Sequence, residues 1–349
     1  MRVLNTLPQG DLRDVAAAAQ ASEAAGYDGL MTMENKHDPF LAHAIAAVTT
    51  DRIELGTSVA IAFPRSPMVV ANAAWDLQNA SRGRFVLGLG PQIRPHNEKR
   101  FSVAWTAPAP RLREYVGALR AIWTSWETGE KLDFRGKHYT FTLMPPYFVP
   151  ESTGQKMVPV TLAAVGPHSL RMAGEVGDGV RLHGFCTRRY MEVEILPKLQ
   201  EGMAKTGRAR EHFEITGGGF IATGTTEETT ARMFEIVRNR VAFYGTTPSY
   251  WPVFDLHGLG DLGRELNAMS KAGKWAELAS RVPDDVVHLF AAVGTHKEIA
   301  KRIAERFGGL SDALSLQPDS TGASEDIPPD LMQDIKRIPT MFRGYKTPW

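Results

Sequence analysis

The sequence predicts an α/β fold, a (β/α)8 TIM barrel with insertions, and three observations lead to it. Short apolar runs of β-type residues alternate with amphipathic helical patterns from residue 2 onward, which is typical of a parallel sheet with crossover helices. Eight such strand signals occur along the chain. The length of 349 residues also suits a single barrel, a fold that spans roughly 250–400 residues. A doubly wound open sheet is the alternative.

The first half of the chain predicts four regular strand–helix units. Their strands are expected at Arg2–Leu7, Asp28–Met33, Ile53–Ile61 and Phe85–Gly90. Asp11 is expected to cap the first helix and Gly26 to end it, and Gly83 breaks the third helix. A strongly amphipathic helix follows, with an apolar face from Leu112 to Trp126. This face either packs in the core or meets a partner chain.

The second half repeats the alternation less evenly. Its strands are expected at Val158–Val165, Gly179–His183, Phe213–Thr223 and Ala313–Gln317. Capping boxes formed by Thr225 with Glu228 and by Thr295 with Glu298 predict two helix starts. Three segments interrupt the alternation: a long loop at about 91–110, a hairpin at 131–150 and a mostly helical stretch at 246–285. Because insertions explain the extra length, we expect one barrel domain over residues 1–349.

The composition narrows the class of partner. The 40 basic and 39 acidic residues give a net charge of +1, so no global field favours nucleic acid or an anionic membrane. No apolar run approaches the roughly 18 residues of a membrane span, and the N-terminus has no signal-peptide pattern. The single cysteine, Cys186, excludes an internal disulfide and is expected to be a buried thiol. We therefore expect a soluble, cytoplasmic, globular protein.

Polar residues gather where the loops after the predicted strands converge, the end of a barrel that carries its chemistry. They include Glu34, His37, Ser58, His96, His168, Ser169 and His183. A carboxylate such as Glu34 at a strand end needs a ligand or a partner. His37 beside Asp38 is either an acid–base pair or a solvent-exposed histidine whose neighbour caps the next helix. His183 is either a site residue or a half-buried histidine bonded to backbone.

Three glycine-containing segments point to a ligand, and two of them have a plainer alternative. The run Ala163–Leu170 ends a strand in Gly-Pro, so the first amides of the next helix face an anion such as phosphate, or simply start a helix. Gly88 and Gly90 permit close approach of the backbone to a ligand. Gly217–Gly219 either leaves room for a flat ligand or marks a bulge. No P-loop and no complete dinucleotide fingerprint is present.

A metal site is a further alternative, because His37, His96 and His183 could converge on one ion. The sequence has no H-x-H or HExxH spacing and no clustered carboxylates of the kind that hold a metal. We therefore expect no metal, and a metal-dependent barrel hydrolase is the last of the functional alternatives.

Several segments together resemble the bacterial luciferase-like monooxygenase superfamily, over about the whole chain. They are EAAGYDGLMTMENKHDPF, IELGTSVAIAFPRSP, SRGRFVLGLG, AAVGPHSLRMAGEVGDGV and GTHKEIAKRI. Within this superfamily, ENKHDPF and GLGPQIRPHNEKRF are similar to the branch that uses the deazaflavin coenzyme F420 in place of FMN. The resemblance implies a barrel that holds a flavin-type ring at the C-terminal ends of its strands and transfers hydride at C5 of that ring.

The resemblance also implies site residues. A bulge that often holds a non-proline cis peptide would support the ring at Ser58–Val59, and a phosphate-binding turn maps onto Val165–Ser169. The residues expected to contact the cofactor are Glu34, Asn35, Ser58, Val59, His96, Val165, Gly166, Pro167, His168 and Ser169. Asn35 stands where F420-dependent dehydrogenases frequently carry a catalytic histidine, and Ile93 where some carry a glutamate. Sugar-phosphate dehydrogenase activity is therefore not expected.

The first functional hypothesis is an F420-dependent oxidoreductase that transfers hydride between the deazaflavin C5 and a small organic substrate. Its expected catalytic residues are His37 and His183, for proton transfer or substrate orientation, and Glu34. An FMN-dependent monooxygenase that uses reduced flavin and O2 is the second hypothesis. A non-catalytic flavin- or deazaflavin-binding protein is the third, because the residues at positions 35 and 93 depart from the catalytic pattern. The superfamily resemblance also implies a homodimer.

Overall fold

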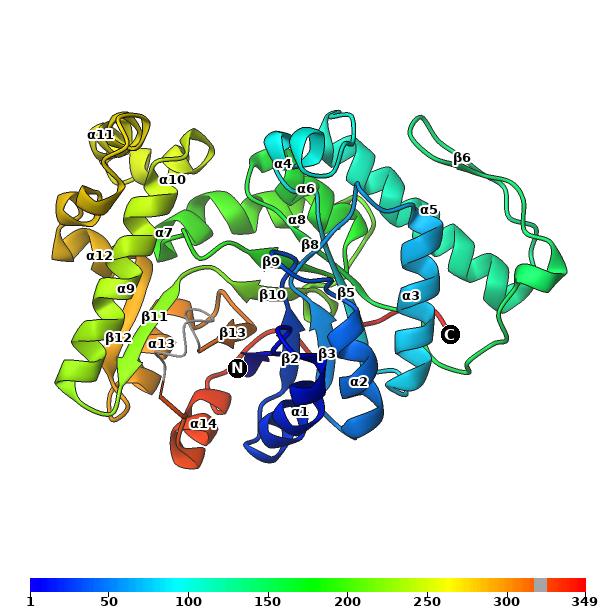
Figure 1. The fold of residues 1–349 in the computed structure, drawn as a ribbon, viewed down its shortest axis with the longest axis horizontal. Coiled ribbons are helices and arrows are strands. Elements are labelled where there is room, and N and C mark those ends of the chain that lie inside the picture. The colour runs from blue at the N-terminus through cyan, green and yellow to red at the C-terminus, as the bar shows by residue number, and fades with distance from the viewer. Residues whose placement is uncertain (317–324) are drawn as a thin grey trace.

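The computed structural model describes residues 1–316 and 325–349, and within them eight parallel strands close into a barrel (Figure 1). The ring closes because β1 pairs with both β2 and β13, and β3 pairs with β5. The strands in ring order are β1 (Arg2–Thr6), β2 (Gly29–Thr32), β3 (Glu54–Thr57), β5 (Phe85–Gly90), β8 (Val160–Ala163), β9 (Gly179–Leu182), β10 (Glu214–Gly217) and β13 (Ala313–Ser315). The predicted barrel is confirmed, and the open sheet is wrong.

Helices surround this ring and bury its outer face (Figure 1). The helices of the described residues are α1 (Val15–Ala24), α2 (Leu41–Thr49), α3 (Pro67–Ala80), α4 (Arg94–Lys99), α5 (Pro108–Thr128), α6 (Pro167–Val176), α7 (Arg188–Tyr190), α8 (Leu196–Ala204), α9 (Glu227–Gly245), α10 (Trp251–Asp255), α11 (Gly260–Lys271), α12 (Asp284–Phe290), α13 (Ile299–Phe307) and α14 (Pro329–Lys336). The apolar face of α5 is buried within the chain, with Trp123 at 0% and Trp126 at 4% exposure. Of the two alternatives for this face, core packing is the one observed. None of the described helices is long and apolar enough to cross a membrane.

Two of the predicted strands are interrupted. The expected strand Ile53–Ile61 is divided into β3 and β4 (Ala60–Ile61) at Ser58–Val59, whose peptide bond is cis, as the resemblance implied. The expected strand Phe213–Thr223 is divided into β10 and β11 (Phe220–Gly224). Gly217 and Gly218 have φ angles of +85° and +96°, which break the strand at this point. The bulge alternative for these glycines agrees with the structure.

Some local predictions in the second half are wrong. Strand β12 (Ala291–Thr295) was not predicted; it pairs with β11 outside the ring and follows α12 directly, so no loop marks its start. Thr295 therefore ends a strand and caps no helix. Helix α9 is capped by Thr226, which accepts from the Thr229 N–H, while Thr225 is bonded to Glu325 instead. Of the expected last strand, Gln317 lies outside the described residues.

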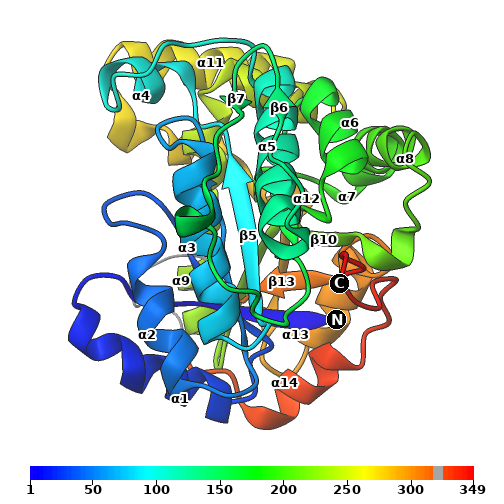
Figure 2. The same ribbon diagram turned by 90° about the vertical axis from the view of Figure 1, so that its right-hand side faces the viewer.

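The three interrupting segments have the predicted character with one addition. Residues 131–150 contain the antiparallel hairpin of β6 (Phe134–Arg135) and β7 (Thr140–Phe141), and residues 246–285 are mostly helical. The segment 91–110, expected as a loop, contains the short helix α4. Figure 2 shows α4 and α11 at the end of the barrel toward which β5 points. The first and third segments therefore lie at the end that carries the predicted site.

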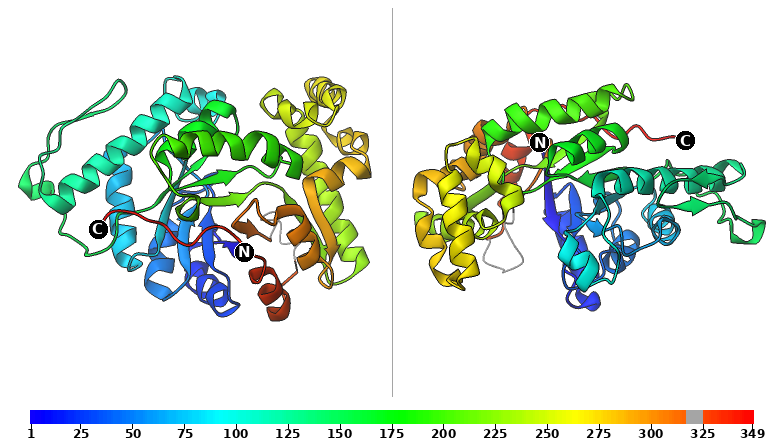
Figure 3. Two further views of the ribbon diagram at one scale, coloured as in Figure 1. Left: turned by 180° about the vertical axis from the view of Figure 1, so that it is seen from behind. Right: turned by 90° about the horizontal axis from the view of Figure 1, so that it is seen from above.

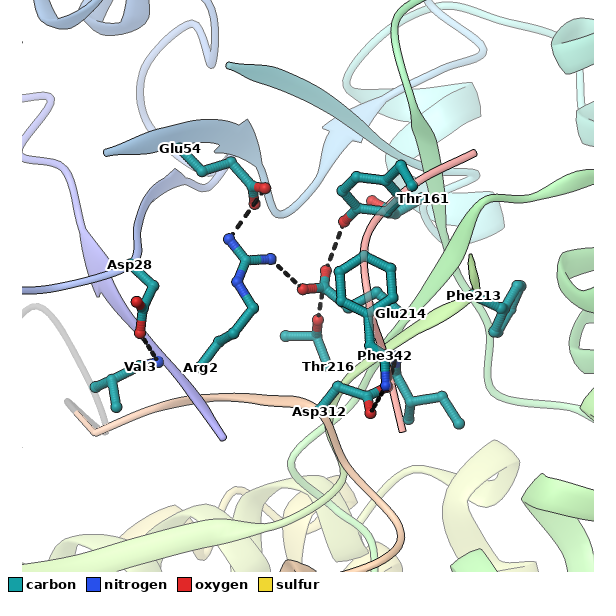
Figure 4. Close-up of polar contacts among 12 residues, drawn as sticks. Arg2, Val3, Asp28, Glu54, Thr161, Phe213, Glu214, Thr216, Asp312 and Phe342 are labelled. Carbon is teal, nitrogen blue, oxygen red and sulfur yellow. Dashed lines mark hydrogen bonds and ion pairs between the residues drawn. The ribbon is translucent and has the colours of Figure 1, made fainter. Parts of the chain in front are cut away.

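A chain of buried charges fills the opposite end of the barrel interior. Arg2 lies between Glu54, at 3.0 Å, and Glu214, which is fully buried (Figure 4). Glu214 also lies 3.4 Å from Arg181 and accepts a hydrogen bond of 2.7 Å from the Tyr345 hydroxyl. Burial alone would raise the pKa of Glu214, but the guanidinium groups of Arg2 and Arg181 outweigh it and lower this pKa. Glu214 is thus held as a carboxylate.

The C-terminal segment covers this charged interior. It runs from α14 past the N-terminus as an extended chain across the barrel (Figure 3). Tyr345 on this segment reaches Glu214, and the Gly344 carbonyl oxygen lies 2.9 Å from Nδ1 of His212. The Met157 N–H donates to the carbonyl of Pro348 over 3.0 Å. The segment thus lies against Glu214, whose side chain is fully buried, and an ion pair is stronger where water is excluded.

Removing the central carboxylate is expected to destabilise the fold. Replacement of Glu214 by Gln leaves Arg2 and Arg181 buried with too little compensating charge, so the free energy of unfolding should fall by about 3–5 kcal/mol. Denaturant unfolding monitored by circular dichroism measures the change. The control is Asp261→Asn, which removes an exposed pair with Arg264 and should cost about 0–1 kcal/mol. Equal effects of the two substitutions would contradict the central role of Glu214.

Candidate active site

A cavity of about 470 Å³ opens at the C-terminal ends of the barrel strands. It brings together the predicted residues Glu34, Asn35, Ser58, Val59, Val165, Gly166, Ser169 and His183. Its walls come from the ends of β2, β5, β8 and β9 and from the bulge between β3 and β4. This is the position at which barrel enzymes hold their reactants.

A second cavity of about 540 Å³ adjoins the first, and both are lined by Gly166 and Ser169. It lies at the N-terminus of α6 and contains Pro167 and His168 of the predicted phosphate-binding turn. Its other wall carries Arg113, Arg171 and Lys205. Arg113 and Lys205 both pair with Glu175, and Arg171 pairs with Glu201. Three cations against two carboxylates, with the free amides of the helix start, leave this cavity electropositive.

The carboxylate of Glu34 has protein partners. It accepts hydrogen bonds from the Ile61 N–H at 2.6 Å and from Arg65 at 2.8 Å, and its side chain is 6% exposed. Arg65 in turn pairs with Asp38 at 3.1 Å. Ile61 belongs to β4, directly after the Ser58–Val59 bulge. Glu34 therefore ties the end of β2 to the segment that forms the bulge.

His37 and His96 do not reach either cavity. His37 is exposed, and Asp38 accepts from the Phe40 N–H at 2.8 Å at the start of α2. Of the two alternatives for this pair, the exposed histidine beside a helix cap is the one observed. His96 is half-buried on α4. Among the described residues no group of three or more His, Cys, Asp or Glu side chains is placed to hold a metal ion.

The imidazole of His183 is fixed on the cavity wall. Its Nδ1 accepts a hydrogen bond of 2.9 Å from the Phe185 N–H. Its ring stacks on Tyr250 at 4.7 Å between centroids and meets the edge of Tyr244 at 4.3 Å. Burial, with a smaller contribution from Arg240, lowers the pKa of His183 to about 4. The imidazole is therefore neutral at pH 7.

Arg181 and Tyr250 are two polar residues of the cavity that were not predicted from the sequence. Arg181 on β9 is 5% exposed and donates to the hydroxyls of Thr161 at 3.1 Å and Thr216 at 2.9 Å. An arginine in a strand of otherwise apolar residues was the available signal for it. Tyr250 comes from the short turn Pro248–Tyr250 within the segment 246–285. No spacing in the sequence connects that segment with β9.

The two glycines of β5 have different roles. A Cβ on Gly88 would lie 1.8 Å from the backbone oxygen of Thr57, so Gly88 is required for strand packing. Gly90 lines the cavity, and its Cβ would lie 2.7 Å from a methyl group of Val59. Close approach of a ligand, as predicted for both glycines, is therefore compatible only with Gly90.

A closed barrel with a cavity at the C-terminal ends of its strands has the architecture that barrel enzymes share. The family model described as luciferase-like monooxygenase matches residues 2–312. The chain belongs to this family, which supports an oxidoreductase or monooxygenase.

The relatives include both deazaflavin and flavin proteins. The uncharacterized protein Rv1360 of Mycobacterium tuberculosis is 44% identical, over 93% of this chain and 95% of its own length. A putative coenzyme F420-dependent oxidoreductase of that organism, Rv3520c, is 29% identical, over 85% of this chain and 87% of its own. Among solved structures, the coenzyme F420-dependent tetrahydromethanopterin reductase of Methanopyrus kandleri matches with a TM-score of 0.76 and 18% identity, over 97% of each chain. The oxygenating constituent of 3,6-diketocamphane monooxygenase of Pseudomonas putida, in complex with FMN, matches with a TM-score of 0.66 and 15% identity, over 97% of each chain.

The contrast between Gly88 and Gly90 can be tested with alanine. Gly88→Ala forces a backbone oxygen to move and should lower the free energy of unfolding by about 3 kcal/mol or more. Gly90→Ala meets a side chain that can shift and should cost about 1 kcal/mol. Thermal or denaturant unfolding of the two variants under identical conditions measures the difference. A larger loss of stability for Gly90→Ala than for Gly88→Ala would contradict the close packing of β5 against β3 at Gly88.

Proposed function

We propose that the protein is an F420-dependent oxidoreductase that acts on a small organic substrate. The observation that carries this proposal is the pair of adjoining cavities on either side of Gly166 and Ser169. The first, called the ring cavity below, is bounded by the Ser58–Val59 bulge and suits a flat ring. The second, called the tail cavity, is electropositive and suits an anionic side chain. The family membership and the 29%-identical relative support the same assignment.

The residues present fit a deazaflavin with a long acidic side chain. The ring cavity has apolar walls at Val59, Ile61 and Val165, which favour an aromatic ring. The helix start at Gly166–Ser169 offers free amides to a phosphate. F420 carries carboxylates beyond its phosphate, whereas FMN ends at the phosphate, and Arg113, Arg171 and Lys205 would bind those carboxylates. The second cavity therefore favours F420 over FMN.

Each part of the site has a distinct task in this proposal. The bound deazaflavin supplies hydride chemistry at C5. Ser58 and Val59 support one face of the ring, and Glu34 holds that bulge in place through Ile61 and Arg65. His183 and Tyr250 form the wall that meets the substrate. Glu34 serves as an anchor because its carboxylate is already bonded, and no contact among residues 1–316 and 325–349 gives His37 or His96 a catalytic role.

Two other functions on the same scaffold make different predictions. An FMN-dependent monooxygenase would bind FMN in preference to F420 and consume O2 with reduced flavin. A non-catalytic binding protein would bind cofactor without turnover; Asn35 and Ile93, which both line the ring cavity, supply no acid or base. Turnover of reduced F420 with any member of a ketone, imine and quinone panel would exclude the binding-only function.

The cofactor assignment can be tested by titrating the protein with F420, FMN and the deazaflavin that lacks phosphate and side chain. We expect F420 to bind most tightly. Lys205→Met combined with Arg113→Met should weaken F420 about tenfold or more and leave the side-chain-free deazaflavin unchanged, because only the tail is affected. Fluorescence titration gives the dissociation constants, and Lys297→Met on the surface is the control. Selective binding of FMN, or equal losses for both deazaflavins, would contradict the proposal.

We also propose a homodimer that forms through α2 and α3. Leu41 and Val48, one face of α2, are 56% and 72% exposed, and Val69 on the adjacent α3 is 58% exposed. These apolar side chains are stabilised when a second copy covers them.

Val48→Glu combined with Val69→Glu should convert a dimer into monomers, because two buried charges would face each other across a symmetric interface. Sedimentation velocity measures the association state. Leu143→Glu, which changes an apolar side chain of 79% exposure in the 131–150 segment, is the matched control. A monomeric wild-type protein would refute this assembly.

A further inference from the structure

We propose that His183 acts as a fixed, neutral hydrogen-bond donor that positions the substrate through Nε2–H and does not carry a proton in the reaction. The substrate would then present a hydrogen-bond acceptor beside its reacting carbon. The identity of the reaction rests on the proposed F420-dependent function, whereas the state of the imidazole does not. The contacts of His183 on each side of its ring support this role.

First, the hydrogen bond at Nδ1 determines which nitrogen of His183 carries the proton. The Phe185 N–H donates to Nδ1 of His183, so Nδ1 must hold a lone pair. A neutral imidazole has one N–H group, which therefore lies on Nε2. Among the described residues the hydrogen bond of this imidazole is the one on Nδ1, no group bonds to Nε2, and His183 lines the ring cavity. The structure thus leaves one donor available on this wall.

The second step is the orientation of that donor. Tyr250 stacks on the imidazole with an angle of 30° between the rings, and Tyr244 meets it edge-on at 82°. Phe185, whose N–H holds Nδ1, is itself packed against Tyr250 at 5.5 Å between centroids. Rotation of the imidazole would break the hydrogen bond and the stack together. The direction of the Nε2–H group is therefore set before any ligand binds, which reduces the entropic cost of binding.

The third step is the charge of the imidazole. The charged groups that face it are Arg240 of α9 and Arg181 of β9, which are both cations, and the neighbouring titratable groups are the phenols of Tyr244 and Tyr250. Glu34 is the carboxylate that lines the cavity, and Arg65 pairs with it. Burial and the neighbouring cation lower the pKa of His183 to about 4. The ring consequently remains neutral through the range in which an exposed histidine titrates.

These three properties define a role in hydride transfer. When reduced F420, the proposed hydride donor, reduces a C=O or C=N bond, a C–H bond of the donor would break and the donor would be oxidised. The hydride would form a bond with the substrate carbon, the π electrons would move to oxygen or nitrogen, and that atom would take a proton from water. Negative charge develops on the heteroatom, where the Nε2–H of His183 would stabilise it. His183 keeps its proton throughout, because losing it would leave an imidazolate. The residue is thus a positioning donor and differs from the acid–base histidine expected at position 37.

The state of His183 can be measured without cofactor or substrate. Histidine-selective ¹⁵N NMR of the full chain, with His183→Gln used to assign the signal, should show the neutral Nε2–H form from about pH 5 to 8. Tyr250→Phe keeps the stack and should leave this signal unchanged, whereas Tyr250→Ala opens the site and should let His183 titrate. A wild-type titration midpoint between about 6 and 7, or a proton on Nδ1, would overturn the proposal.

The donor role requires the F420-loaded enzyme and a panel of ketones and imines. His183→Met removes the donor and should lower kcat/KM about 10- to 100-fold, while His183→Gln retains an N–H donor and should remain within about threefold of wild type. Affinity for F420 should be unchanged in both. Equal losses in the two variants would overturn the donor role. So would a titration near neutral pH in the activity of wild type that is absent in His183→Gln, and so would a lack of turnover across the panel. A failure to bind F420 would overturn the proposed function instead and leave the NMR result standing.

Discussion

The buried chain of charges from Glu54 through Arg2 and Glu214 to Arg181 is the interaction on which the barrel and its cavity both depend. Four strands contribute to it, since Glu54 lies on β3, Arg2 on β1, Glu214 on β10 and Arg181 on β9. An ion pair taken out of water is stable only when its remaining hydrogen-bonding groups are also satisfied. The hydroxyls of Thr161, Thr216 and Tyr345 meet part of this demand. The barrel interior is therefore polar at the end opposite the cavity, and the directions of these hydrogen bonds and ion pairs set the positions of the four strands.

This arrangement determines what remains open at the other end. Arg181 is held by threonine hydroxyls on both neighbouring strands, so its guanidinium forms part of the cavity without filling it. On β5, which one strand separates from β9, Gly90 leaves space for Val59 because a side chain there would collide with it. Glu34 and Arg65 fix the segment that follows. The shape of the cavity thus depends on the buried guanidinium of Arg181, on the absence of a side chain at Gly90 and on the ion pair of Glu34 with Arg65.

The sequence was sufficient for the ring of strands because each strand has an apolar run and a helix after it. It was also sufficient for much of the cavity, since strand ends in a barrel meet at one rim, and Glu34, Ser58, Gly166 and His183 were found in this way. It failed where no periodic signal exists. Strand β12 has two alanines and a glycine and follows a helix without a loop, and Tyr250 reaches the site from a distant segment. His37 was predicted in the site but is exposed and lines neither cavity, because a sequence does not show whether a loop turns a side chain toward solvent.

Cations lie near both cavities and have two related effects on the site. Cations surround the tail cavity at Arg113, Arg171 and Lys205, and Arg181 and Arg240 lie near the ring cavity. Such a field favours negative charge on a bound ligand and disfavours positive charge on His183. A histidine that must remain neutral beside cations is poorly suited to relay protons and well suited to donate a hydrogen bond. The same field that would attract an acidic cofactor therefore also keeps His183 neutral. In the proposed function, hydride transfer would then need no acid or base at position 35, where this chain has asparagine.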